Sequence, residues 1–218
     1  MRVGVYVDGF NLYYGGRSLC GRGQAGWRWL DVRALSEGST HPDWRTSGAH
    51  IERIVYCTAR ISGSSNSASQ AEQDVYLKAL VGTSAIDHVE YGVFVERVKN
   101  APLAVGDAKG RPVLATSAWP VMIKDAEAVD VPNARFMVSV AYREEKGSDV
   151  NVALQLLVDV LDGDVDAAIV VSNDSDLAFP LATARARVPV GTVNPSRAYL
   201  AGRLRGLPGD GVGPHWWR

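Results

Sequence analysis

The strongest constraint on the fold is a short, continuous apolar run that stops abruptly at a cluster of acidic residues. Residues 167–171 (AAIVV) are all apolar, which is typical of a parallel strand covered on both faces, and residues 172–176 (SNDSD) end the run. A second run at 3–7 (VGVYV) ends in a similar way at Asp8 and Gly9. The sequence therefore predicts two buried strands, each followed by a carboxylate at its carboxyl end.

Strand and helix patterns alternate along the rest of the chain. Further strands are expected at 51–58, 89–98, 136–142 and 188–193, and helices at 10–19, 30–35, 71–81, 148–161, 177–185 and 198–204. Ser148 is expected to be the N-cap of the helix that follows it. The alternation predicts an α/β fold with a doubly wound, mostly parallel sheet flanked by helices and right-handed crossovers.

Two stretches lack such patterns. Residues 61–69 (ISGSSNSAS) have the composition of a flexible loop. Residues 99–134 contain four prolines and are expected to form an irregular excursion, with a short strand at 113–114. A chain of 218 residues leaves little room for two domains, so we expect one domain at 1–195 and an extension at 196–218 that packs on it.

Composition excludes several classes of protein. Hydrophobic residues make up 46% and charged residues 22%, as in ordinary globular proteins, so disordered and fibrous structures are not expected. No run reaches the roughly 18 apolar residues that a membrane helix needs, and the chain opens directly on a strand, so we expect a cytoplasmic protein with no membrane partner. Cys20 and Cys57 lack zinc-site spacing and are expected to be buried thiols.

The charges are segregated along the chain although the net charge is only -1. Residues 144–176 contain nine acidic residues and one basic residue, Lys146, whereas residues 177–218 contain six arginines and one acidic residue, Asp210. An acidic region beside a basic one suits a metal-dependent enzyme that acts on a polyanion. Charges that merely solvate different faces of the molecule would give the same pattern.

The acidic residues at the ends of the predicted strands indicate a metal site. The carboxyl ends of parallel strands meet at one edge, so Asp8, Asp174 and Asp176 should face one cavity, which Asp149 can join from the first turn of its helix. Four carboxylates repel one another, and hard oxygen ligands favour Mg²⁺ or Mn²⁺. Alternatively, each residue alone could serve only as a turn residue or a helix cap.

Other catalytic motifs are not supported by their context. Residues 21–26 (GRGQAG) match the glycine spacing of a dinucleotide-binding loop, but they follow a predicted helix instead of the first strand. The sequence contains no phosphate-binding GxxxxGK[ST] motif and no recognisable Ser/His/Asp arrangement. The acidic residues are therefore the leading candidates for a catalytic site.

Three motifs together resemble the NYN domain, a branch of the PIN-like nucleases. They are residues 7–12 (VDGFNL), 145–150 (EKGSDV) and 172–177 (SNDSDL), and residues 73–80 (QDVYLKAL) are similar to the family's middle helix. The resemblance covers about residues 1–195. It departs from the family at Asn173, where many relatives have glycine.

The resemblance implies a PIN-like sheet, a magnesium or manganese site, and cleavage of RNA phosphodiester bonds. Asp8, Asp149, Asp174 and Asp176 occupy the family's acidic positions, and Asn11 matches the asparagine that would orient Asp8 or a metal-bound water. Lys146 could neutralise a phosphate oxygen, although a solvated loop lysine is an equal alternative. Because the bond must be accessible at a sheet edge, single-stranded or looped RNA is the expected substrate.

Two other functions remain open, namely a non-catalytic RNA-binding or assembly module that retains the metal site, and a small-molecule phosphohydrolase. The second lacks support because Asp8-Gly9-Phe10 has no second aspartate of a DxD motif. At the carboxyl end, Arg197, Arg203 and Arg205 could bind phosphates while Trp216 and Trp217 stack on bases. The alternative that we favour is that the tryptophans dock this tail on its own domain or on a partner subunit.

Overall fold

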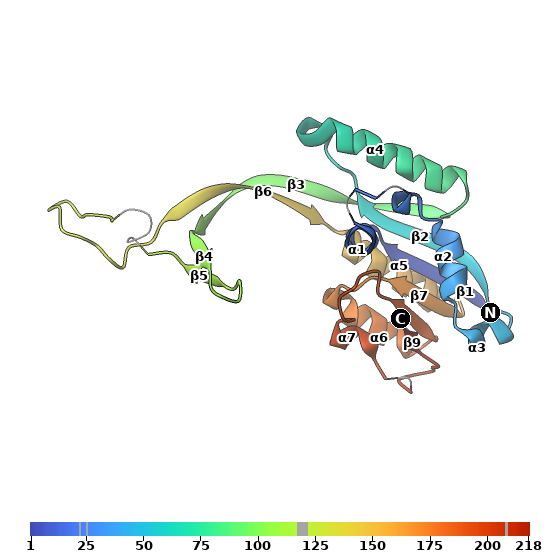
Figure 1. Cartoon of the computed structure of the whole chain (residues 1–218). Helices are drawn as coiled ribbons and strands as arrows, with labels where there is room; N and C mark the ends of the chain where they lie inside the picture. The colour runs from blue at the N-terminus through green and yellow to red at the C-terminus, as the bar shows by residue number, and fades with distance from the viewer. Residues whose placement is uncertain (22, 25, 117–121, 208) are drawn as a thin grey trace. The chain divides into compact units, whose positions relative to one another are not determined.

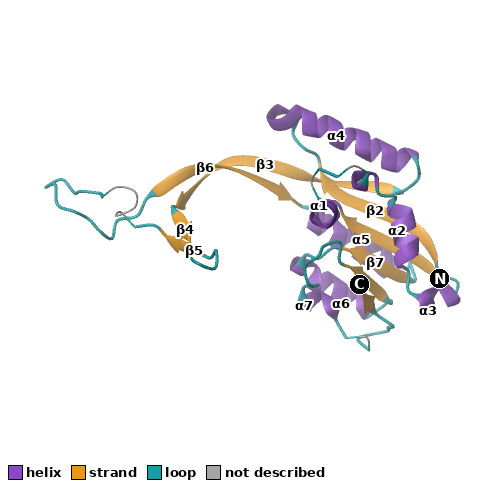
Figure 2. Ribbon diagram, in the orientation of Figure 1, coloured by secondary structure: helices purple, strands orange, loops and turns teal. Residues whose placement is uncertain are grey.

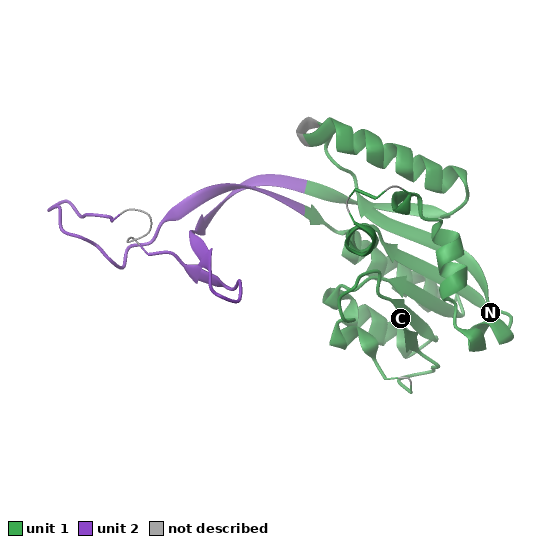
Figure 3. Cartoon of the chain, in the orientation of Figure 1, with its two compact units in different colours: residues 1–94, 145–218 green, residues 95–144 purple. Residues whose placement is uncertain are grey.

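The computed structural model describes residues 1–21, 23–24, 26–116, 122–207 and 209–218, with only the backbone at Ser64 and Ser65 (Figure 1). The chain divides into two compact units (Figure 3). Unit 1 comprises Met1–Phe94 and Glu145–Arg218, and unit 2 comprises Val95–Glu144. No helix in the described part of the chain is both long and apolar enough to cross a membrane.

The main sheet has seven strands in the order β6-β3-β2-β1-β7-β8-β9. Their bounds are β1 Arg2–Asp8, β2 His50–Ala59, β3 His88–Pro102, β6 Met137–Lys146, β7 Ala167–Val171, β8 Val190–Val193 and β9 Trp216–Trp217. Five neighbouring pairs are parallel: β1 with β2 and β7, β2 with β3, and β8 with β7 and β9. The prediction of a mostly parallel α/β sheet is confirmed, and β7 has the predicted bounds.

Helices cover both faces of this sheet in unit 1 (Figure 2). One face packs against α1 Gly9–Cys20, α2 Val32–Ser39, α3 Pro42–Thr46 and α4 Gly63–Gly82. The other packs against α5 Ser148–Asp162, α6 Ala178–Arg185 and α7 Gly202–Arg205, and two 3₁₀ turns, η1 Trp27–Trp29 and η2 Ser175–Leu177, complete the elements. Alternate residues of β1 serve the two cores, because Val5 and Val7 face one layer of helices and Tyr6 the other.

Helix α5 shows how the pattern of apolar residues positions an element. Val152, Leu156 and Val160 recur at every fourth residue and are buried against the sheet. The helix begins at Ser148, within the predicted range, but the prediction of Ser148 as its N-cap is wrong, because the N-cap is Gly147 in a left-handed conformation that favours glycine. Ser148 is the first helical residue, and its backbone N–H and its hydroxyl both donate to Glu145 Oε1.

The expected loop at 61–69 is wrong, because α4 already begins at Gly63. The helix is interrupted at Asn66, whose φ of -160° and ψ of 81° are not helical. Asn66 Oδ1 accepts a hydrogen bond from the backbone N–H of Ser69, so the asparagine restarts the helix as a cap. The polar composition that suggested a loop therefore marks a kink.

Several smaller expectations also need correction. Helix α2 begins at Val32 instead of residue 30, α3 is absent from the prediction, and the last helix is reduced to Gly202–Arg205. The sequence analysis did not predict β9 Trp216–Trp217, which pairs with β8 at the edge of the sheet. A strand of two residues is too short to produce a recognisable alternating pattern.

The two cysteines differ in environment. Cys57 is buried, as expected, and its burial raises the pKa of the thiol to about 12. Cys20 is exposed, so the prediction of a buried thiol is wrong there, because Cys20 is the last residue of α1. Both thiols are free.

Unit 2 is more regular than the predicted excursion. Strand β3 extends to Pro102, and β4 Ala104–Gly106 pairs antiparallel with β5 Pro112–Leu114. Within this unit, Arg97 forms an ion pair with Glu144, and the Lys99 ammonium lies 3.4 Å from the centre of the Tyr142 ring. The expected strand at 113–114 is present, while residues 117–121 lie outside the described residues.

Candidate active site

The candidate active site lies where the order of strands reverses in unit 1. From β1 the chain proceeds to β2 and β3 on one side, and later to β7 and β8 on the other. Val7 pairs with Val171, so Asp8 at the end of β1 lies beside Ser172 at the end of β7. Ligands of open parallel sheets bind at such a reversal, beyond the carboxyl ends of the strands.

Asp8 is held there by three hydrogen bonds. Its Oδ1 accepts from the backbone N–H of Asn11 at 3.0 Å, which makes Asp8 the N-cap of α1. Its Oδ2 accepts from Asn11 Nδ2 at 2.7 Å and from the Ser172 hydroxyl at 3.0 Å. The residue is only 3% exposed. Gly9 follows directly, and any Cβ at that position would collide with the Tyr56 ring.

Burial has the largest effect on the charge of Asp8. Loss of solvent raises the pKa of this carboxyl, the hydrogen bonds from Asn11 and Ser172 lower it, and the nearby charge of Asp174 raises it again. The net shift is upward, so the site is unfavourable for an isolated carboxylate. A bound cation would offset that penalty. We call Asp8, Asn11, Ser172 and Asp174 the acidic edge.

Asn11 and Ser172 connect the two strand ends. Asn11 donates to Asp8, and its Oδ1 accepts from the backbone N–H of Asn173 at 3.2 Å. Ser172 donates to Asp8, and its Oγ accepts from the backbone N–H of Asp174 at 3.1 Å. Asn11 therefore orients Asp8, as expected. The sequence did not identify Ser172 as a site residue, although its position in the SNDSD turn could have indicated it.

Asp174 and Asp176 have different roles in the turn after β7. Asp174 is the N-cap of η2, and its Oδ1 accepts from the backbone N–H of Asp176 at 3.0 Å. Asp176 is exposed, whereas Asp174 is partly buried and close enough to Asp8 to affect its pKa. Asp174 therefore belongs to the acidic edge, and Asp176 lies within η2.

Asp149 and Lys146 reach the same edge of the sheet from β6 and α5. On β2, Cys57 pairs with Asp8, and Ala59, two residues farther along, pairs with Gly92 of β3. Gly92 therefore lies near the carboxyl end of the same sheet edge. A Cβ at Gly92 would collide with the carbonyl oxygen of Lys146, so the glycine permits the close approach of the segment that starts α5. Asp149 is partly buried in the first turn of α5, and Lys146 is exposed.

The expectation that four carboxylates converge into one group is not met. Over the described ranges, which omit residues 22, 25, 117–121 and 208, no three His, Cys, Asp or Glu side chains are grouped so that they could hold a metal ion. Asp8 and Asp174 interact electrostatically, while Asp176 lies farther along η2 and Asp149 belongs to α5. The donors still suit a hard ion, because Mg²⁺ is held through about one or two carboxylates and several waters.

The three arginines proposed to bind substrate lie in the C-terminal tail. Arg197 donates to the carbonyl oxygen of Leu19 at 2.9 Å. The Arg205 guanidinium lies 5.9 Å from the centre of the Trp217 ring, and Arg203 is exposed. Trp216 is buried, with its ring 5.5 Å from that of Trp44. Two of the three cations therefore already contact the protein itself.

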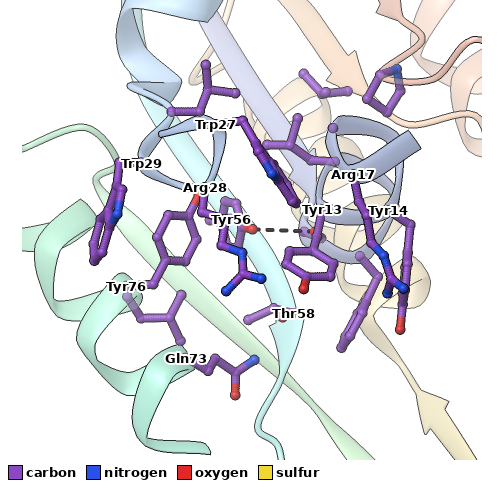
Figure 4. A pocket seen from close by; sticks show the side chains of 18 of the residues that line it. Tyr13, Tyr14, Arg17, Trp27, Arg28, Trp29, Tyr56, Thr58, Gln73 and Tyr76 are labelled. Atoms are coloured by element: carbon purple, nitrogen blue, oxygen red, sulfur yellow. Dashed lines mark hydrogen bonds between the residues drawn. The ribbon is translucent and has the colours of Figure 1, made fainter. Parts of the chain in front are cut away.

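A second feature, which the sequence analysis missed, is a cavity of about 1040 Å³ in unit 1. Figure 4 shows aromatic rings from α1, η1, β2 and α4 around it. We call it the aromatic cavity; its rings are Phe10, Tyr13, Tyr14, Trp27, Trp29, Tyr56 and Tyr76. The clustering of aromatic residues between positions 10 and 29 was a signal that could have indicated it.

Comparisons with known proteins give one named relative. The chain is 31% identical over 209 residues to 6-hydroxy-3-succinoylpyridine 3-monooxygenase HspA of Pseudomonas putida, an enzyme. The match includes 90% of this chain and 60% of the relative, so the chain spans less than two thirds of the relative's length. No family model matches the chain.

A solved structure also resembles the chain, although weakly. It is a protein of unknown function, VPA0982 from Vibrio parahaemolyticus, with 16% identity and a TM-score of 0.49. The match covers 99% of this chain and 91% of the other. The fold class described above follows from the sheet topology.

Proposed function

We propose that this chain is an NYN-like, Mg²⁺- or Mn²⁺-dependent ribonuclease that hydrolyses phosphodiester bonds at the acidic edge. The observation that carries the proposal is the environment of Asp8. A carboxylate that is buried, oriented by three donors and close to a second carboxylate is more costly than a simple helix cap requires. The three motifs that resemble the NYN domain contain these residues.

Asp8 and Asp174 would hold the metal ion, and waters would complete its coordination. When bound, such an ion would lower the pKa of a water and neutralise charge on the scissile phosphate. Asn11 and Ser172 keep the Asp8 carboxylate in place, so little reorganisation is needed during the reaction. Lys146 remains a proposed phosphate contact, and single-stranded or looped RNA the proposed substrate.

A second candidate function, oxygenation of a heteroaromatic ring, is favoured by the name of the 31% identical relative. Such a reaction inserts one oxygen atom into the substrate and needs an electron donor for the other. Gly21, the first glycine of the motif at 21–26, is the C-cap of α1 instead of following a strand, which does not match the context of a dinucleotide-binding loop. Any cofactor would therefore need another site.

One set of assays separates these functions. Purified protein would be incubated with labelled single-stranded RNA while Mn²⁺ is titrated, and in parallel with p-nitrophenyl phosphate. Oxygen uptake would be measured with 6-hydroxy-3-succinoylpyridine and a reduced nicotinamide. Mn²⁺-dependent RNA cleavage that Asp8→Asn removes supports the proposal.

Each other outcome contradicts the proposal in a distinct way. RNA binding without cleavage at any Mn²⁺ concentration would indicate the non-catalytic module. Hydrolysis of p-nitrophenyl phosphate alone would indicate a small-molecule phosphohydrolase. Oxygen uptake coupled to loss of the pyridine, without RNA cleavage, would assign the relative's reaction to this chain.

A further inference from the structure

The aromatic cavity has the size and composition of a ligand site. Its volume of about 1040 Å³ is at the upper end of typical small-molecule pockets, on the order of 300–1,000 Å³. All its lining residues belong to unit 1. Gly9 and Val171 line it and adjoin Asp8 and Ser172 along the chain, so the cavity lies beside the acidic edge.

Several of its rings are exposed, which the packing of the core does not explain. Tyr13, Tyr14 and Trp29 are 39%, 57% and 59% exposed, although each contacts another ring of the cavity. Figure 4 places Trp29 and Tyr76 on one side and Tyr13 and Tyr14 on the other. Exposed aromatic faces around a hollow are suited to stacking on a flat ligand.

The polar groups at this cavity are cationic. Figure 4 shows the guanidinium groups of Arg17 and Arg28 among the rings. Arg28 lies 5.8 Å from the centre of the Trp27 ring and 3.4 Å from Glu72 in a solvent-exposed ion pair, which is a weak attachment. Among the described residues, no hydrogen bond or ion pair engages the Arg17 guanidinium. These cations can bind an anionic group.

We propose that the aromatic cavity binds a planar heteroaromatic ring that carries an anionic group. The rings would stack on the heterocycle, and Arg17 would contact the phosphate or carboxylate. Two ligands share this chemistry: a nucleotide unit of RNA, and a free heteroaromatic acid such as the substrate in the relative's name. The proposal concerns binding alone, so it does not depend on whether the acidic edge cleaves RNA.

The test is equilibrium binding to the full chain in the presence of EDTA, which prevents metal-dependent cleavage. The probes are uridine 5′-monophosphate, uridine and 6-hydroxy-3-succinoylpyridine. The binding of each probe would be measured by calorimetry. The variants are Trp29→Ala, Trp29→Phe and Arg17→Ala, with Tyr199→Ala and Arg187→Ala as matched controls. Tyr199 is 93% exposed, and neither control residue lines the cavity. Circular dichroism would establish that each variant folds.

We expect one of the two anionic probes to bind. Its affinity should fall about fivefold or more in Trp29→Ala, recover in Trp29→Phe, and stay unchanged in both controls. Arg17→Ala should weaken binding of the anionic probe and leave the weaker binding of uridine unchanged. Tighter binding of the nucleotide assigns the cavity to RNA, and tighter binding of the pyridine acid assigns it to a small molecule.

Three results would overturn the proposal. They are failure of both anionic probes to bind, binding that neither Trp29→Ala nor Arg17→Ala alters, and, where the nucleotide is the tighter ligand, equal affinity for uridine and its monophosphate. Because no metal is present, none of these results bears on the ribonuclease proposal, which is tested by cleavage.

Discussion

The acidic edge and the arginines of the C-terminal tail were both candidate RNA contacts, although docking was the favoured interpretation of the tail, and the structure uses their charged groups differently. At the edge, two carboxylates lie close together and burial makes the charge of Asp8 unfavourable. In the tail, charged groups contact the protein itself: Arg197 donates to the carbonyl oxygen of Leu19, and Arg205 lies over Trp217. The proposed site is therefore placed at the acidic edge because its two close carboxylates, of which Asp8 is buried, repel one another, and not because of the number of charges in either region.

The largest expected effect is that of Asp8→Asn on cleavage. We expect Mn²⁺-dependent RNA cleavage to fall at least about 100-fold, because the ion loses its best-oriented ligand. The melting temperature without metal should stay close to that of the unmodified protein. Removal of a buried charge offsets the loss of the two hydrogen bonds that Oδ2 accepts, and Oδ1 can still accept from the Asn11 backbone N–H. Cleavage rates and thermal melts would measure both effects.

Asp162→Asn serves as the control, because Asp162 is an exposed acid at the end of α5, away from the edge. Its cleavage rate should equal that of the unmodified protein. A clear loss of metal-free stability in Asp8→Asn would show instead that Asp8 is mainly a structural cap.

Substitutions at Asp174 and Asp176 compare two carboxylates of the same turn for their effect on RNA cleavage. Asp174→Asn should reduce cleavage by about 10- to 100-fold, because Asp174 is the carboxylate close to Asp8. Asp176→Asn should have a smaller effect, since Asp176 is exposed at the start of η2. The rates would be compared at saturating Mn²⁺. Equal and complete losses would refute this ranking and favour two ions.

In the tail, the expected effect is on stability. Gly191 of β8 lies under the Trp216 ring, and a Cβ there would collide with it. Gly191→Ala should therefore destabilise the fold by about 1–3 kcal/mol, as overpacking does. Gly202→Ala is the matched control, because a Cβ at Gly202 meets nothing within 4 Å. Thermal or urea unfolding would measure the difference.

RNA cleavage by Gly191→Ala, assayed below its melting temperature, should be retained if the tail and the edge are independent. A loss of cleavage comparable to that of Asp8→Asn would remove the distinction between the two regions.

The smallest expected effect is a pH dependence of the local stability of the tail. His215 Nδ1 accepts from the backbone N–H of Val190, and its Nε2 faces the carbonyl oxygen of Asp210. Burial lowers the pKa of His215 below its usual value of 6.5. The neutral ring is therefore the stable form, so its contribution to stability is complete above pH 6.5 and decreases as the pH falls below it.

Hydrogen exchange of residues 209–218 should therefore speed up between pH 7.5 and 5, after correction for the intrinsic rate. His88→Gln, which removes a surface histidine paired with Glu90, should leave this dependence unchanged. Protection of the tail that is constant over that range would contradict the assignment.

The sequence predicted the framework because burial leaves a direct mark on it. Continuous apolar runs located β1 and β7, and the acidic turns that follow them located Asp8 and Asp174. Prediction failed where a local contact decided the structure. Asn66 restarts α4 within a loop-like composition, and the β9 strand depends on Trp216 packing against Gly191 and Trp44.

The candidate site was predictable only in part, because some of its contacts are local in the sequence and others join distant segments. Asp8 and Asn11 are three residues apart, so their hydrogen bond follows from helix capping. Their contact with Ser172 spans 164 residues and depends on how β7 pairs with β1. The aromatic cavity combines rings from four elements, so no single segment of sequence contains its pattern.

The most direct test of the central claim is calorimetric titration of Mn²⁺ into the metal-free protein and into Asp8→Asn and Asp174→Asn. The account predicts saturable binding to the unmodified protein, and binding at least about tenfold weaker in each variant. Saturable binding that both substitutions leave unchanged, or no binding to the unmodified protein, would contradict the claim that Asp8 and Asp174 form a metal site.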